Sequence, residues 1–134
     1  MIIRFTFALL TLVIFVGCGH QNDTSDTAVR KNLPGTWHSD VAPQTESKFM
    51  VSANGDFECK TTFQGDTNGM QTIELEGTFQ VKDGILIETV TKSSQTNAHV
   101  PFVSRARVIQ ADDHEMVISP LNRTNRIVWE KHTS

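Results

Sequence analysis

The sequence predicts an all-β domain, a single small antiparallel meander of eight strands that closes into a barrel or, alternatively, folds as a β-sandwich. Apolar residues recur with period two from Leu33 onward. Turn-forming Gly, Asn, Asp and Pro residues interrupt this alternation at nearly regular spacing. No stretch of the domain carries a convincing helical stripe. Together these observations favour a β meander over any helical or mixed class.

The first half of the domain alternates most clearly. Strands are expected near residues 36–41, 48–53, 57–64 and 72–81. Asn54-Gly55 and Asp83-Gly84 are dipeptides typical of tight hairpin turns that need positive φ. Neighbouring strands on either side of these turns are therefore expected to pair antiparallel.

The second half continues the pattern with shorter strands, near residues 85–92, 102–110, 115–119 and 125–131. Pro101 precedes the first residue of one of them, where a missing N–H matters least. The loops 65–69 and 93–98 are the expected functional rims, because loops carry binding residues more often than strands do.

Alternation also predicts the core. The residues expected to face inward are Trp37, Phe49, Val51, Phe57, Cys59, Phe63, Ile73, Leu75, Phe79, Val81, Ile85, Ile87, Phe102, Val108, Ile118, Ile127 and Trp129. Each large buried side chain contributes about 1.5–3 kcal/mol. Such a core supports a domain of this size without a disulfide, and we expect Cys59 to be a buried, unreactive thiol.

A leader of 17 residues precedes the domain. Arg4 is followed by an apolar run over residues 5–16, which as a helix reaches only about 18 Å and is too short for a bilayer core of about 30 Å. The run ends in Val16-Gly17-Cys18. This ending resembles the lipobox of bacterial lipoproteins, although Phe15 stands where the family prefers leucine.

The lipoprotein resemblance implies cleavage after Gly17 and lipid on Cys18, which would anchor the chain in a membrane of the cell envelope. Because Gly19 rather than aspartate follows the cysteine, the resemblance implies the outer membrane if the organism is Gram-negative. The polar residues up to Asn32 lack periodicity, so residues 18–32 are expected to be the lipidated cysteine and a flexible tether. The β domain is then residues 33–134.

The domain opens with Gly35-Thr36-Trp37, which resembles the Gly-x-Trp signature of the lipocalins and of bacterial lipocalin-like lipoproteins. The resemblance implies that Trp37 plugs the closed end of the barrel and that an arginine near the last strand packs across its ring. Arg126 is the expected partner, with Arg123 as the alternative. It further implies a lumen that binds a small, apolar ligand.

Charge and motifs exclude several other classes. The net charge of −3 becomes −4 once Arg4 leaves with the leader, and without a Lys/Arg cluster this argues against nucleic acid. No nucleophile motif and no metal-ligand spacing of His and Cys is present, so no enzyme activity, cofactor or metal is expected. Glu74 and Glu76 are expected on an exposed polar face.

The sequence leaves the placement of two pairs of polar residues undecided. Arg105 and Arg107 share one face of a strand. Facing inward they would hold an anion or a ligand carboxylate, and facing outward they would be surface charges. His38 and His132 would be neighbours on the outer face if the first and last strands pair. The sequence thus leaves two functions: a membrane-anchored binding module, or a structural or interaction lipoprotein with a packed core.

Overall fold

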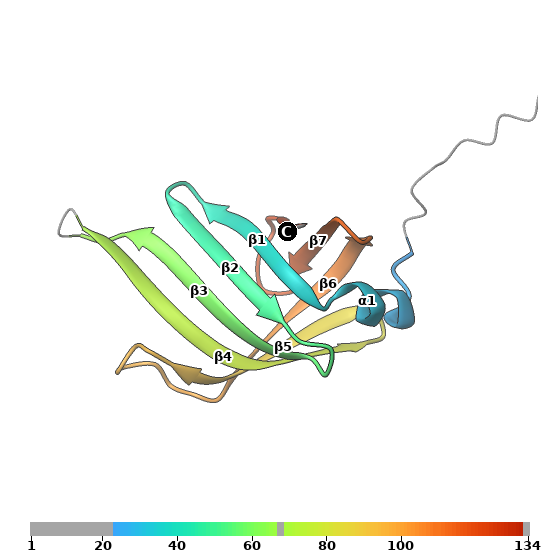
Figure 1. The fold of residues 1–134 in the computed structure, drawn as a ribbon, viewed down its shortest axis with the longest axis horizontal. Coiled ribbons are helices and arrows are strands. Elements are labelled where there is room, and N and C mark those ends of the chain that lie inside the picture. The colour runs from blue at the N-terminus through green and yellow to red at the C-terminus, as the bar shows by residue number, and fades with distance from the viewer. Residues whose placement is uncertain (1–22, 67–68, 133–134) are drawn as a thin grey trace, which may run out of the picture.

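Eight antiparallel strands close into a barrel in the order of the sequence, and one short helix precedes them (Figure 1). The structure is a computed structural model that describes residues 23–66 and 69–132. The elements are α1 (Asp26–Asn32), β1 (Gly35–Ala42), β2 (Thr45–Val51), β3 (Asp56–Gln64), β4 (Met70–Lys82), β5 (Ile85–Ser93), β6 (Phe102–Ala111), β7 (Glu115–Pro120) and β8 (Ile127–Lys131). The leader and Cys18 lie outside the described residues, so cleavage and lipidation stay predictions.

The predicted all-β meander is confirmed, and of the two architectures it is the barrel that forms. Closure rests on a short β1–β8 pairing, in which Trp37 lies opposite Lys131 and His38 opposite Glu130. Both predicted hairpin turns have the expected backbone, with φ of +91° at Gly55 and of +55° and +73° at Asp83 and Gly84. An eight-stranded barrel of this kind is compatible with a lipocalin-like fold.

The two ends of the barrel differ. Strands β2 to β5 extend well beyond the short β7 and β8, so the sheet is long on one side and short on the other (Figure 1). At one end α1 lies against the β4–β5 turn, and we call this the closed end. The opposite end, which carries the β1–β2, β3–β4, β5–β6 and β7–β8 connections, is the open end.

Helix α1 corrects the predicted tether, which was expected to continue to Asn32. The Ser25 side chain accepts a hydrogen bond from the backbone N–H of Ala28 and caps the helix. Val29 is completely buried, and Leu33 just after the helix is nearly so. Burial of these two apolar side chains holds the segment on the barrel, so any tether ends before α1.

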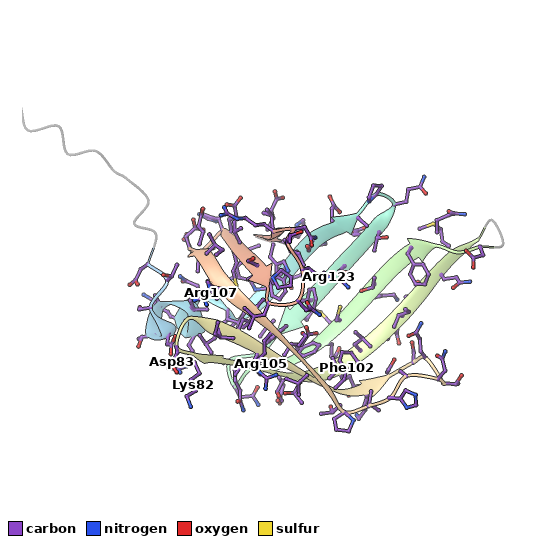
Figure 2. The ribbon with its side chains drawn as sticks, turned by 180° about the vertical axis from the view of Figure 1, so that it is seen from behind. Lys82, Asp83, Phe102, Arg105, Arg107 and Arg123 are labelled. Atoms are coloured by element: carbon purple, nitrogen blue, oxygen red, sulfur yellow. The ribbon has the colours of Figure 1, made fainter. Side chains whose placement is uncertain are left out.

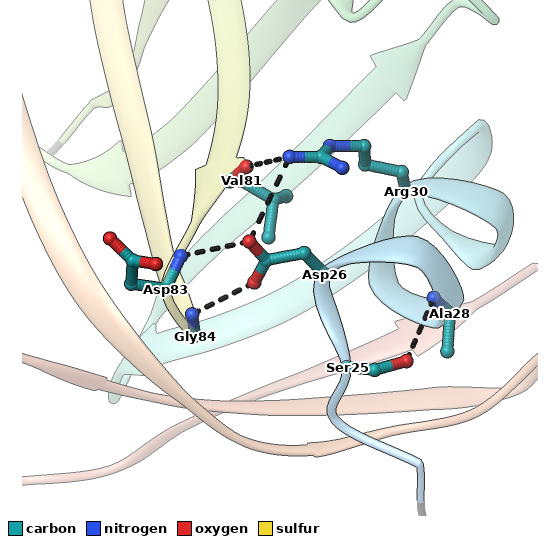
Figure 3. Close-up of polar contacts among 7 residues, drawn as sticks. All are labelled: Ser25, Asp26, Ala28, Arg30, Val81, Asp83 and Gly84. Atoms are coloured by element: carbon teal, nitrogen blue, oxygen red, sulfur yellow. Dashed lines mark hydrogen bonds and ion pairs between the residues drawn. The ribbon is translucent and has the colours of Figure 1, made fainter.

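Asp26 attaches α1 to the β4–β5 turn (Figure 3). Its carboxylate accepts hydrogen bonds from the backbone N–H groups of Asp83 and Gly84, both at 2.8 Å. Arg30 lies 3.8 Å from the same carboxylate and donates to the carbonyl of Val81. The two backbone hydrogen bonds, and to a lesser extent Arg30, lower the pKa of Asp26.

We expect Asp26→Asn to loosen this attachment. An amide presents one acceptor oxygen where the carboxylate presents two, so the amides of Asp83 and Gly84 should exchange with solvent about tenfold faster at neutral pH. Because the folded-state pKa of Asp26 is lowered from 3.8, its stabilising effect is present above the unfolded pKa and disappears as the pH falls through the folded one. The difference in amide exchange between the two proteins should therefore be full at pH 7 and become smaller as the pH falls below 3.8.

Most predicted core residues are buried, and in the described part of the chain seven further apolar residues are buried: Val29, Leu33, Leu86, Val90, Ala106, Ala111 and Met116. On β5 the predicted face is wrong. Leu86 and Val90 point inward, whereas Ile85 and Ile87 are half-buried on the outer face. Towards the open end Phe63 and Ile73 are only half-buried, and Phe102 is 41% exposed. The inner face of the sheet is therefore more exposed at the end away from α1.

Within residues 23–66 and 69–132, no helix has the length and apolar character needed to cross a membrane.

Candidate ligand-binding site in the barrel lumen

Aromatic rings fill the middle of the barrel. Phe49 stacks on Trp129 with ring centroids 4.6 Å apart, and Phe79 meets the edge of Trp129 at 5.6 Å. Phe57 packs on Phe79 at 4.5 Å on the side nearer the closed end. All four side chains are buried or nearly buried. This aromatic layer separates the closed end from the space above it.

A cavity of about 220 Å³ lies on the aromatic layer, beneath the β7–β8 turn at the open end. Its wall is apolar for the most part. The residues that line it are Phe49, Phe79, Leu86, Glu88, Ser104, Arg105, Ala106, Ile118, Pro120, Asn122, Arg123, Ile127 and Trp129. An apolar cavity with a few polar groups at one side is typical of small-molecule sites in proteins.

Glu88 is the acidic side chain in this wall. It shares the inner face of β5 with Leu86 and Val90, and its register partners are Phe79 on β4 and Ser104 on β6. The Ser104 hydroxyl donates a hydrogen bond to Glu88 Oε2 at 2.8 Å. Burial raises the pKa of Glu88, and the Ser104 hydrogen bond opposes that shift only in part. An ionisable carboxyl group with a raised pKa is thus built into a wall that is apolar for the most part.

Further hydroxyl groups face the lumen on the opposite side, from Ser39, Ser47 and Thr61. Ser47 and Thr61 are 2.9 Å apart through their hydroxyl oxygens, and adjacent strands bring the three residues side by side. The Ser39 hydroxyl is buried with no hydrogen-bond partner. Buried hydroxyls of this kind ordinarily find a partner, so this part of the lumen favours water or a ligand with a polar group.

Cys59 lies between these hydroxyls and the aromatic layer. Burial raises the pKa of its thiol to about 11, and the hydroxyl of Thr61, 3.6 Å from the sulfur, opposes the shift. The nearby Glu88 carboxylate raises it further. Since the thiolate is the reactive form, the geometry agrees with the expectation of an unreactive thiol.

We expect native Cys59 to react with iodoacetamide at least about a hundredfold more slowly than in denaturant at pH 8, since two pKa units alone lower the thiolate fraction by that factor. Peptide mass spectrometry of timed samples would measure the rate at Cys59 separately from Cys18. Equal rates in the folded and unfolded chain would contradict the buried position.

Arg105 and Arg107 lie on the outer face of β6, which is the second of the two orientations considered from the sequence. Both are exposed and alternate on β6 with the buried Ala106 and Val108 (Figure 2). Across the outer face they lie opposite Ile87 and Ile85 of β5. Both are exposed surface charges, and because Arg105 borders the cavity whereas Arg107 does not, the two do not form a paired anion site in the lumen.

The Gly-x-Trp segment lies at the closed end. Gly35 begins β1 with φ of +133°, and Trp37 is completely buried, with its indole N–H donating to the carbonyl of Leu33 at 2.7 Å. The cation across its ring is Lys131, whose ammonium lies 4.8 Å from the ring centroid. The β1–β8 register places Lys131 opposite Trp37. The expected partner Arg126 is instead exposed just before β8, and the alternative, Arg123, lies at the open end.

Other sequence-selected residues lie apart from the lumen. The rings of His38 and His132 are 5.0 Å apart, and His38 lies 3.4 Å from Glu46. Glu74 and Glu76 are exposed and pair with Lys60 and Lys92 respectively. Among the described residues, no group of three or more His, Cys, Asp or Glu side chains is placed to hold a metal ion.

Sequence reasoning missed Glu88, Ser104 and the β7–β8 turn as site elements. The run Ile85-Leu86-Ile87 is apolar at every position, so alternation alone leaves the face of Glu88 undecided. Val90 could have indicated the face of Glu88, because residues two positions apart on a strand lie on the same face. The predicted rim 93–98 belongs to the open end, but the cavity is covered instead by Asn122 and Arg123.

No family model matches the chain, and neither does any curated protein.

Proposed function

We propose that this chain is a membrane-anchored lipoprotein whose lipocalin-like barrel binds a small, mainly apolar ligand in its lumen. The observation that carries the proposal is the cavity of about 220 Å³ between the aromatic layer and the β7–β8 turn. Apolar side chains form most of its wall, while Glu88 and Ser104 supply polar atoms on one side. A site of this composition binds an apolar body and orients one polar group.

The anchor and the cavity would lie at opposite ends of the barrel. The described chain begins at Asp23, close to α1 at the closed end (Figure 1). Five peptide steps separate Asp23 from Cys18 and reach at most about 18 Å. A lipid on Cys18 would therefore hold α1 near the membrane. The open end would face away from it, so the ligand would enter from the aqueous side.

The second candidate is an interaction lipoprotein with a packed barrel. The size of the cavity favours it, because ligand sites commonly measure about 300–1,000 Å³. In that case the four aromatic rings would be structural filling, and function would lie on the outer face, where Ile85, Ile87, Arg105 and Arg107 lie together.

Native mass spectrometry of the chain purified from its host membrane tests the proposal. A bound small molecule that is lost on unfolding supports the binding module, and its mass gives the ligand class. A chain that stays empty after exposure to a lipid extract of the host supports the interaction module.

Separately, Cys18→Ser should move the protein out of the membrane fraction and lower its mass by that of the lipid; an unchanged mass would refute the anchor.

A further inference from the structure

We propose that the lumen selects a small organic ammonium ion, an apolar ring or short chain that carries one protonated amine, with Glu88 as the group that binds the amine. The inference rests on the proposed binding function and names the ligand class of that site. It comes from three features of the cavity: an uncompensated carboxyl group, aromatic faces beside it, and the size of the space.

Glu88 has an acceptor available for a ligand. Its Oε2 accepts from Ser104 at 2.8 Å, whereas no hydrogen bond in the described part of the chain involves its Oε1. Among the ion pairs of residues 23–66 and 69–132, none includes Glu88. Partial burial without a cation disfavours the charged form of Glu88, and an ammonium ligand that reaches Oε1 would supply both the charge and the hydrogen bonds.

The charged and titratable groups around Glu88 leave this role open. On the β3 side lies the Cys59 thiol, which is neutral because its pKa is raised to about 11. On β4 and β6 the register partners are Phe79 and Ser104. Two arginines, Arg105 of β6 and Arg123 of the β7–β8 turn, also border the cavity, but both are exposed, so solvent screens their charge, and neither forms an ion pair with Glu88 (Figure 2). Among the described residues that line the cavity, Glu88 is thus the one carboxyl group, and no ion pair compensates its charge.

Aromatic rings favour the same ligand. Phe49, Phe79 and Trp129 all line the cavity, and Phe79 lies directly opposite Glu88 in the β4–β5 register. A cation is attracted to the faces of such rings, more strongly once it is desolvated, while a carboxylate is not. A neutral apolar ligand would use the rings but would leave the Glu88 oxygen without a partner.

The volume limits the size of the ligand. About 220 Å³ is below the range of sites for drug-sized molecules, so the space suits a single ring or short chain rather than a phospholipid or a long acyl chain. A matched set of probes is cyclohexylmethylamine, cyclohexylmethanol and cyclohexanecarboxylate. The three share one body and differ in the charge of the head group.

The experiment titrates each probe into the purified full chain in phosphatidylcholine vesicles, with calorimetry and with tryptophan fluorescence, to which Trp129 in the cavity wall contributes beside Trp37. The matched protein is Glu88→Gln, which keeps the shape of the side chain and removes its charge. A charged hydrogen bond in a buried site favours the amine over the alcohol by about tenfold to a hundredfold. Glu88→Gln should abolish this preference, because it should weaken binding of the amine far more than binding of the alcohol.

The pH dependence gives an independent readout. Burial raises the pKa of Glu88, so amine affinity should increase as the pH rises through that pKa, and Glu88→Gln should show no such increase. Equal or tighter binding of the alcohol or the carboxylate would overturn the ammonium assignment.

A cavity-filling variant, Ala106→Leu, distinguishes failure of the ammonium assignment from failure of the proposed lumen site. If no probe binds, or if binding survives in Ala106→Leu, it is the lumen site itself that fails.

Discussion

Replacing Trp37 with alanine should lower the free energy of unfolding by about 3–5 kcal/mol, the range for removing a large aromatic side chain from a core. The indole is completely buried at the closed end, and its ring lies 6.4 Å from that of Trp129. Its N–H donates to the carbonyl of Leu33, the residue that joins α1 to the barrel. The variant therefore loses core volume and the hydrogen bond that fixes the helix. Urea denaturation of both proteins measures the difference.

Two matched variants divide this effect. Trp37→Phe keeps an aromatic ring and leaves the Leu33 carbonyl without its donor, so we expect a loss of about 1–3 kcal/mol. Lys131→Met keeps the apolar stem and removes the ammonium 4.8 Å above the indole together with its hydrogen bond to the carbonyl of Asn32, which should cost about 1–3 kcal/mol. A loss below about 1 kcal/mol in Trp37→Ala would contradict the closed end described above, because no full indole burial is consistent with so small a change.

Much of the fold follows from the sequence because each strand has its own local signal. Alternation of apolar and polar residues specifies which face of β2, β3 and β4 is buried, since a shift by one residue would expose the whole apolar face. The dipeptides Asn54-Gly55 and Asp83-Gly84 supply the backbone that tight hairpins require. Strand order then follows from the turns, because short connections make neighbours in sequence neighbours in space.

Helix α1 could not be predicted from the sequence because its helical periodicity is weak. Seven residues contain one strongly apolar position, Val29, and helical periodicity needs a window of about 11–18 residues to be visible. The helix is stabilised by tertiary contacts, which are the burial of Val29 and the hydrogen bonds of Asp26 to the β4–β5 turn. Contacts of this kind join residues more than fifty positions apart, and local sequence does not encode them.

The candidate site was even harder to predict from the sequence than the helix. Where apolar residues occupy both faces of a strand, as at Ile85, Leu86 and Ile87, the buried face is decided by packing against neighbouring strands. That ambiguity hid the inward position of Glu88. The cation over Trp37 was assigned to Arg126 from the lipocalin resemblance, whereas the β1–β8 register brings Lys131 there. Register across the closure of a barrel depends on all eight strands together.

Gly77 should tolerate no side chain, and Gly77→Ala is expected to cost about 3 kcal/mol or more, at or beyond the upper end of the usual range for overpacking. Gly77 lies on the inner face of β4, beside an irregularity in the β4–β5 register, and pairs with Phe57 and Val90. An added Cβ would lie 2.0 Å from the carbonyl oxygen of Thr89 and 2.9 Å from Val90 Cα. Both are backbone atoms that cannot rotate away, so relief requires β4 and β5 to separate.

Two other glycines are matched controls for Gly77→Ala in the same denaturation assay. At Gly69 an added Cβ meets nothing within 4 Å, so Gly69→Ala should change the free energy of unfolding by no more than about 0.5 kcal/mol. Gly84 also has open space but a φ of +73°, so Gly84→Ala should cost about 1–2 kcal/mol through backbone strain alone. The expected order of loss is Gly77, Gly84, Gly69. A Gly77→Ala protein as stable as Gly69→Ala would mean that β4 and β5 do not approach as closely as the register requires. The cavity wall formed by Phe79 and Glu88, two residues further along the same pair of strands, would then have a different shape.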